Sequence, residues 1–284
     1  MKTITETFPN GIDDIQRYVP DIPSSMYFDG LTASFTNAYL RIANVIGDTF
    51  LDACIDHSED LLKNLTLGAL ANYTMFEQSP FLHKGKNDLY RYQFIEIQDK
   101  YISNAWSFLD ALIKALDAST VADWKEGDCY KNRQNLVFKS QNDFNNYYAI
   151  NNSAYFFSKI VFLIREESNK FIPKRITLVK LEEKASLAEK LKFYIAYRVM
   201  SRAVMQFEVS ELTKSLRHDI NHEFTKYGNL GDGDNKTKLS KYLSGVADDY
   251  SAQLEIEFSK LAGTFANGDI ENPNREDKKY YFMR

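Results

Sequence analysis

Along most of this chain, apolar residues recur at intervals of three and four positions, the spacing that gathers them on one face of an α-helix. The pattern predicts a short helix over residues 12–18 and longer helices over 31–46, 59–77, 89–117, 152–171, 186–226 and 237–265. Gly47, Ser79-Pro80 and Pro173 predict where three of them end, because glycine favours a helix C-terminus and proline cannot donate the hydrogen bond that a helix interior needs. We therefore predict an all-α protein, a helical bundle.

One predicted helix, over residues 186–226, is longer than a compact core needs. At 1.5 Å per residue it would extend for about 60 Å. The pattern leaves two alternatives open, a single long helix or two helices that separate near Phe207.

The helical periodicity disappears over residues 123–148. This stretch is polar and rich in asparagine, with one short β-like run at Leu136-Val137-Phe138. Long segments of this kind often form functional loops or connections between domains. We predict a long irregular connection here, holding a hairpin or an extended arm.

A weak internal repeat relates residues 28–46 to residues 144–164. In both segments an aromatic residue leads into a helix, and the two helices share an apolar spacing, at Ile42, Val45 and Ile46 and at Ile160, Leu163 and Ile164. Amphipathic spacing alone also produces matches of this kind, but the layout favours a duplicated module. We predict two related helical modules, over 1–122 and 151–266, joined by a connecting loop or arm over 123–150 and followed by an extended C-terminal arm over 267–284.

Composition narrows the class of protein further. Hydrophobic residues make up 44% of the chain and charged residues 26%, which is an ordinary globular balance. Glycine and proline number only 12 and 6, too few for the many tight turns of a sandwich or barrel. A formal net charge of −4 argues against a dedicated nucleic-acid-binding module.

Neither secretion nor membrane insertion is expected. The most apolar run, residues 155–164, is interrupted by Ser158 and Lys159 and is far shorter than the roughly 20 residues of a spanning helix. The N-terminal residues lack the apolar core of a signal peptide. Cys54 and Cys129 are far apart in the sequence, and we expect them to be reduced thiols in a cytosolic setting.

The search for catalytic chemistry singles out His218 and His222, which share a helix face at the i, i+4 spacing of zinc ligands. The acid between them, Asp219, does not fit the metalloprotease pattern, and only His57 and His83 remain as further histidines. A solvated helix face is the favoured interpretation, and a metal site is the alternative.

Other acidic groups give no stronger signal. The segment 231–234 predicts a flexible turn rather than a calcium loop, since it lacks the spacing and the closing glutamate of such a loop. The pairs Glu166-Glu167 and Glu182-Glu183 are adjacent in sequence, so they diverge on a helix and are expected to be surface charge. We predict no catalytic residue, no metal ligand and no cofactor, and therefore no enzyme.

The polar C-terminal stretch ends in a short run of aromatic and other large apolar residues. Tyr280, Tyr281, Phe282 and Met283 follow two lysines and precede Arg284. Apolar residues of this size are expected either to fold back onto the protein's own core or to dock on a neighbouring molecule. We assign these four residues as the candidate partner-binding residues.

Several segments between Ile12 and Phe207 carry a family resemblance. They are residues 15–20, residues 42–47, Asp123-Trp124, residues 138–145, residues 152–157, and Glu166-Glu167 ahead of Phe171-Ile172. Together they resemble a family of head–tail connector (neck ring) proteins encoded in phages and prophages of Bacteroidetes, crAss-like phages included. Gly47 is the firmest of these points, and the segment after Phe207 has no clear counterpart in the family pattern.

The resemblance implies an all-helical subunit of a ring, commonly of 12 copies, that lies beneath the portal of a tailed virion. Such a subunit contacts itself, the portal protein and other neck and tail proteins, and DNA passes through the lumen without sequence-specific binding. Its location would be the virion neck, and the host cytoplasm during assembly. The alternatives are a small helical metalloprotein or enzyme that uses His218 and His222, and a cellular helical scaffold protein.

Overall fold

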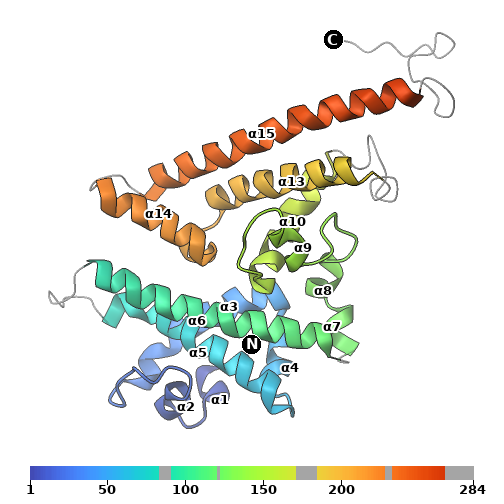
Figure 1. The fold of residues 1–284 in the computed structure, drawn as a ribbon. Coiled ribbons are helices and arrows are strands. Elements are labelled where there is room, and N and C mark those ends of the chain that lie inside the picture. Colours follow the sequence, from blue (N-terminus) through green and yellow to red (C-terminus); the bar gives the residue numbers. More distant parts are fainter. Residues whose placement is uncertain (83–90, 120–121, 171–183, 228–231, 266–284) are drawn as a thin grey trace.

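The computed structural model describes residues 1–82, 91–119, 122–170, 184–227 and 232–265 (Figure 1). The regular structure in these ranges consists of α-helices and short 3-10 helices, with no β-strand among them. The all-α prediction is confirmed.

The elements divide into two halves, which we name by their place in the chain. The N-terminal half contains α1 (Ile4–Thr7), α2 (Ile12–Gln16), η1 (Phe28–Leu31), α3 (Thr32–Ile46), α4 (Asp48–Ile55), α5 (Asp60–Leu82) and α6 (Arg91–Ala118). The C-terminal half contains α7 (Ala122–Glu126), α8 (Asp128–Asn132), α9 (Gln141–Asn145), α10 (Ala154–Ser168), α13 (Ala185–Gln206), η2 (Val209–Glu211), α14 (Lys214–Tyr227) and α15 (Asp232–Phe265).

Each half is organised around a pair of long antiparallel helices (Figure 1). In the N-terminal half α5 packs along α6, and α3 lies against α5. In the C-terminal half α13 packs along α15, where Lys190 bonds to Glu257 and Ser201 to Ser240. The two bonds connect opposite ends of the helices in reverse order, which fixes the antiparallel direction.

The helix α10 joins the halves, because it packs on α13 and also on α6 and α3. Its buried side chains include Tyr155, Phe156, Phe157, Ile160, Leu163 and Ile164. They belong to one contiguous hydrophobic core that extends through both halves. Burial of apolar surface on this scale is the dominant stabilising contribution to the fold.

Polar contacts also cross between the halves. Asp110 of α6 accepts hydrogen bonds from Ser153 Oγ at 2.8 Å and from Tyr155 N at 2.9 Å, and so fixes the first turn of α10. Arg217 of α14 is buried and contacts Asp99 of α6 at 2.8 Å. These contacts position the C-terminal half on α6.

The predicted hairpin within residues 123–148 is wrong. The segment holds α7, α8 and α9, and Leu136, Val137 and Phe138 adopt no strand pairing. Phe138 is buried because its ring packs against Phe144 of α9, with the ring centroids 4.8 Å apart. Helices of five residues are too short to show a 3.6-residue period, which explains why the pattern missed them.

The structure decides between the two alternatives for residues 186–226. The helix breaks after Gln206, and Phe207 has an extended backbone with φ −93° and ψ 151°. Lys236 donates to the carbonyl oxygen of Phe207 at 2.7 Å, and Glu208 and Glu211 form a capping box around η2. The chain then turns into α14.

Smaller boundaries also differ from the prediction. The helix α5 continues through Pro80 to Leu82. In the predicted turn, Asp232 and Asp234 belong to the helix α15, and residues 228–231 lie outside the described residues. The helices α3 and α10 each contain 15 residues, but their relation by duplication stays a prediction. Within the described ranges, no helix is long and apolar enough to cross a membrane.

Candidate functional site

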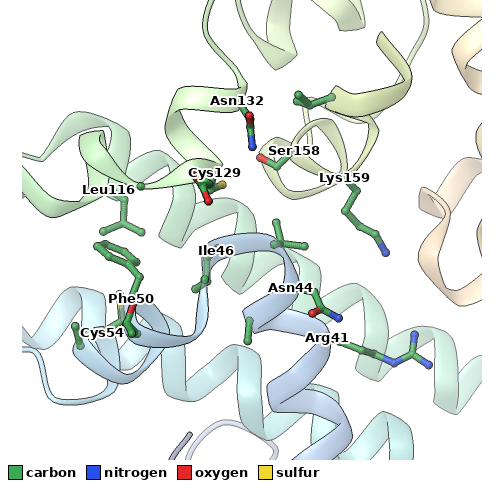
Figure 2. Close-up of a pocket in the computed structure, with 18 of the residues that line it drawn as sticks. Arg41, Asn44, Ile46, Phe50, Cys54, Leu116, Cys129, Asn132, Ser158 and Lys159 are labelled. Carbon is green, nitrogen blue, oxygen red and sulfur yellow. The ribbon is translucent and has the colours of Figure 1, made fainter. Parts of the chain in front are cut away.

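An open groove of about 1130 Å³ lies where the two halves meet (Figure 2). The helices α3 and α4 form one wall, and α8 and α10 form the other. The turn at Gly47 shapes the first wall, because its φ of +93° lets α3 end and α4 begin without an intervening loop. This sharp turn brings Phe50 into the groove.

The second wall is one face of α10. Ser158, Lys159, Val161, Phe162 and Arg165 line the groove, while the other core residues of the same helix lie on its opposite side. Spacings of three and four positions place the lining residues on one side of the helix. The helix is therefore apolar towards the core and mixed towards the groove.

Aromatic side chains supply much of the groove's apolar surface. Phe50 comes from α4, Phe162 from α10 and Phe207 from the break after α13. The rings of Phe162 and Phe207 lie 6.4 Å apart, and the ring of Phe50 lies 5.0 Å from Trp124. Phe162 retains 47% of its surface exposed, which is unusual for a phenylalanine in a concave site.

Charged groups gather beside Phe207, where Figure 2 shows Arg41 and Lys159; the amine of Lys159 lies 5.2 Å from the centroid of the Phe207 ring. Arg41 contacts Glu77 at 2.8 Å, Glu208 at 3.1 Å and Glu211 at 3.7 Å. The amine of Lys159 pairs with Glu211 as well. The five groups join α3, α5, α10 and η2 into one ionic network.

Burial and charge act on these groups in opposite directions. Burial lowers the pKa of Lys159, and Glu211 acts against this effect. Burial would raise the pKa of Glu211, but Lys159 and Arg41 hold it below its ordinary value. Burial raises the pKa of Glu77, because Arg41 compensates only part of its loss of hydration.

Both cysteines of the chain line the groove. Burial raises the pKa of Cys54 to about 12 and also raises the pKa of Cys129. At neutral pH both are therefore protonated thiols, which are poor nucleophiles. The amine of Lys159 is held in its ion pair. The two thiols and the lysine amine of the groove are therefore in protonation states that suit binding and packing rather than nucleophilic attack on a substrate.

The residues predicted from sequence lie elsewhere. His218 is on α14 with 71% of its side chain exposed, at 3.8 Å from Asp219. The side chain of His222, all of His83 and the tail residues Tyr280 to Met283 lie outside the described residues. Within the part of the chain that is described, no group of three or more His, Cys, Asp or Glu side chains is placed to hold a metal ion.

One expectation about acidic residues is wrong. Glu167 is fully buried instead of being surface charge. It contacts Arg202 at 2.9 Å and Lys170 at 2.6 Å, and these cations make burial of the carboxylate tolerable. Glu166 contacts Arg202 and is more exposed, and Glu182 and Glu183 lie outside the described residues.

One feature of the sequence points to the groove, a lysine within an apolar run. Lys159 interrupts the most apolar run of the chain, and a cation at that position needs either water or a carboxylate partner. Glu211 is that partner, 52 residues away in sequence. Comparison of the chain with family models, with curated proteins and with solved structures finds no match.

Proposed function

We propose that this protein is a structural subunit of a larger assembly. The observation that carries the proposal is the groove, a concave surface between the halves where an exposed phenylalanine, Phe162, lies beside the ring of Phe207. Exposed apolar surface in a concave site of this size is typical of a binding surface for another macromolecule.

The particular assembly is proposed from the sequence resemblance. The protein would form a ring in the neck of a tailed phage, between the portal and the tail, and let DNA pass through the lumen. A ring of this kind binds its partners through large interfaces, in which a few buried aromatic side chains contribute most of the affinity. Phe162 and the aromatic residues of the C-terminal tail are suited to that role.

The test is native mass spectrometry with negative-stain imaging of the purified chain, alone and mixed with the portal protein of the same phage. We expect closed rings, formed by the chain alone or on addition of the portal. A chain that stays monomeric at high concentration, and associates with neither portal nor tail proteins, would contradict the proposal.

The metalloprotein alternative is tested on the same preparation. The metal content is measured for the parent chain and for the double variant His218→Ala, His222→Ala. A stoichiometric metal that disappears in the double variant would favour this alternative over the assembly role. We expect no stoichiometric metal in either protein.

A further inference from the structure

We propose that the groove receives residues 278–284 of a neighbouring copy of this chain. The inference rests on the assembly function proposed above and names the contact through which one copy would hold the next. It connects the groove with the candidate partner-binding residues Tyr280, Tyr281, Phe282 and Met283.

The size of the groove favours a peptide segment over a small molecule. Its volume of about 1130 Å³ is above the ~300–1000 Å³ of ordinary small-molecule pockets. The groove is also open along its length, with aromatic surface from Phe50, Phe162 and Phe207. A run of consecutive large apolar side chains such as Tyr280 to Met283 would cover this surface.

The charges of the tail match the order of groups along the groove. In the tail, the apolar run lies between Lys278-Lys279 on one side and Arg284 on the other. In the groove, carboxylates occur at both ends of the aromatic surface. Glu126 and Asp128 line the groove at the α7–α8 end, and Glu211 lines it at the η2 end, where Glu208 pairs with Arg41.

Cations of the groove do not cancel these carboxylates fully. At the α7–α8 end, two carboxylates face one cation, Lys131, which pairs with Glu126. At the η2 end, three carboxylates including Glu77 face the two cations Arg41 and Lys159. Arg165 donates to Asn132, the last residue of α8, and so balances the second carboxylate at the α7–α8 end. The η2 end is left with one negative charge in excess, which is also the charge of the whole site, from five carboxylates and four cations.

Chain length allows the tail to reach a groove on another copy, and symmetry favours that arrangement. The helix α15 ends at Phe265, so 19 residues follow it, and an extended chain of that length reaches up to about 65 Å. A tail from one site of a subunit that enters a different site on the next is a head-to-tail contact. Contacts of this type generate rings when the rotation closes.

The first experiment measures recognition without any ring. A fluorescein-labelled peptide of residues 266–284 is titrated with the full-length chain carrying Tyr280→Ser, Tyr281→Ser and Phe282→Ser, so that the acceptor's own tail does not compete. We expect saturable binding by fluorescence anisotropy. The same peptide with these three serines should not bind, and equal binding of both peptides would overturn the proposal.

Two matched pairs of acceptor variants locate the site. Phe162→Ser should weaken binding by about tenfold or more, because it removes a large apolar contact. Phe81→Ser should leave binding unchanged, since Phe81 is 65% exposed but lies on α5 outside the groove.

The second pair tests the charged contact. Asp128→Lys should also weaken binding, and Asp13→Lys should not. Both aspartates are exposed and lie in the first turn of a five-residue helix, but only Asp128 lines the groove.

The second experiment maps the contact in the intact chain. Phe282 is replaced by a photoreactive benzoylphenylalanine, and the labelled chain is mixed with isotope-labelled copies before irradiation. We expect cross-links between different copies that reach α4 or α10 residues of the groove. Cross-links to the groove of the same copy, to another surface, or to nothing would overturn the proposal.

Failure of this inference differs visibly from failure of the assembly function. Rings that form while the tail cross-links elsewhere would leave the assembly function standing and remove the tail–groove contact. Saturable, Phe162-dependent binding of the peptide without rings would support the tail–groove contact and contradict the ring.

Discussion

The ion pair between Lys159 and Glu211 provides a direct test of how the halves are held together beside the groove. Lys159 has 13% of its side chain exposed and Glu211 has 24%. Removing one partner of a fully buried pair costs about 3–5 kcal/mol, because a buried charge is left without compensation. Since these two groups retain some contact with water, we expect Glu211→Gln to lower the free energy of unfolding by about 2 kcal/mol.

The reverse change should cost less. In Lys159→Met the remaining carboxylate of Glu211 still lies 3.7 Å from Arg41, and the methionine fills a similar volume. We therefore expect a loss of about 1 kcal/mol from this substitution, roughly half of that from Glu211→Gln. The two substitutions differ in cost because of the geometry of the network. Glu211 keeps a second cationic neighbour when Lys159 is replaced, whereas Lys159 loses its ion-pair partner when Glu211 is replaced.

The pH dependence gives an independent check. Burial acts to raise the pKa of Glu211, but Lys159 and Arg41 hold it below the ordinary value of 4.5. A carboxyl whose pKa is lowered by folding stabilises the protein above pH 4.5, and this contribution is lost as the pH falls through the folded-state pKa. Glu211→Gln removes the contribution, so the variant should lose less stability on acidification below pH 4.5 than the parent.

Urea unfolding followed by far-UV circular dichroism measures these differences. Glu126→Gln is the control, because Glu126 pairs with Lys131 but has 77% of its side chain exposed. Exposed pairs are screened by water and contribute little to stability. If Glu211→Gln costs no more than this control, or less than Lys159→Met, the account of the buried pair is wrong.

Two further predictions concern packing and thiol reactivity. A Cβ added at Gly68 would lie 2.5 Å from the ring of Phe108, so Gly68→Ala should destabilise the fold by about 1–3 kcal/mol. At Gly245 nothing lies within 4 Å, so Gly245→Ala should stabilise α15 by about 0.5–1 kcal/mol, and thermal unfolding compares the two. Burial raises the pKa of Cys54 and Cys129, so both should react slowly with Ellman's reagent at pH 8 and quickly once the chain is unfolded in urea. Rapid reaction of the folded chain would contradict the raised pKa of these thiols.

The groove could be predicted from the local sequence pattern only in part. The helix containing Lys159 and Phe162 was predicted, as was the helix ending at Gly47 that forms the opposite wall. Their meeting was not predicted, because amphipathic spacing indicates which face is buried but not against what. Phe162 lies in an apolar run, and only the packing of α10 on α13, α6 and α3 leaves it on the outside.

Buried charge was the other feature that the pattern misjudged. Glu166 and Glu167 are identical in type and adjacent in sequence, and one is more than half exposed while the other is fully buried. Arg202 on α13 contacts both carboxylates, but Glu167 also accepts a hydrogen bond from the Tyr194 hydroxyl within the α10–α13 contact. A carboxylate is buried only where such partners converge, and their convergence is a property of the packed helices.

By itself, the sequence determined the long helices, since their hydrogen bonds are local and their apolar period can be read from consecutive residues. Gly47 in particular determined the end of α3. The tertiary structure alone decided the break at Phe207, whose carbonyl oxygen accepts from Lys236, and the ionic network of the groove, where Arg41 meets Glu208 across 167 residues. Contacts between residues so distant in sequence depend on how the helices pack, and no local spacing encodes them.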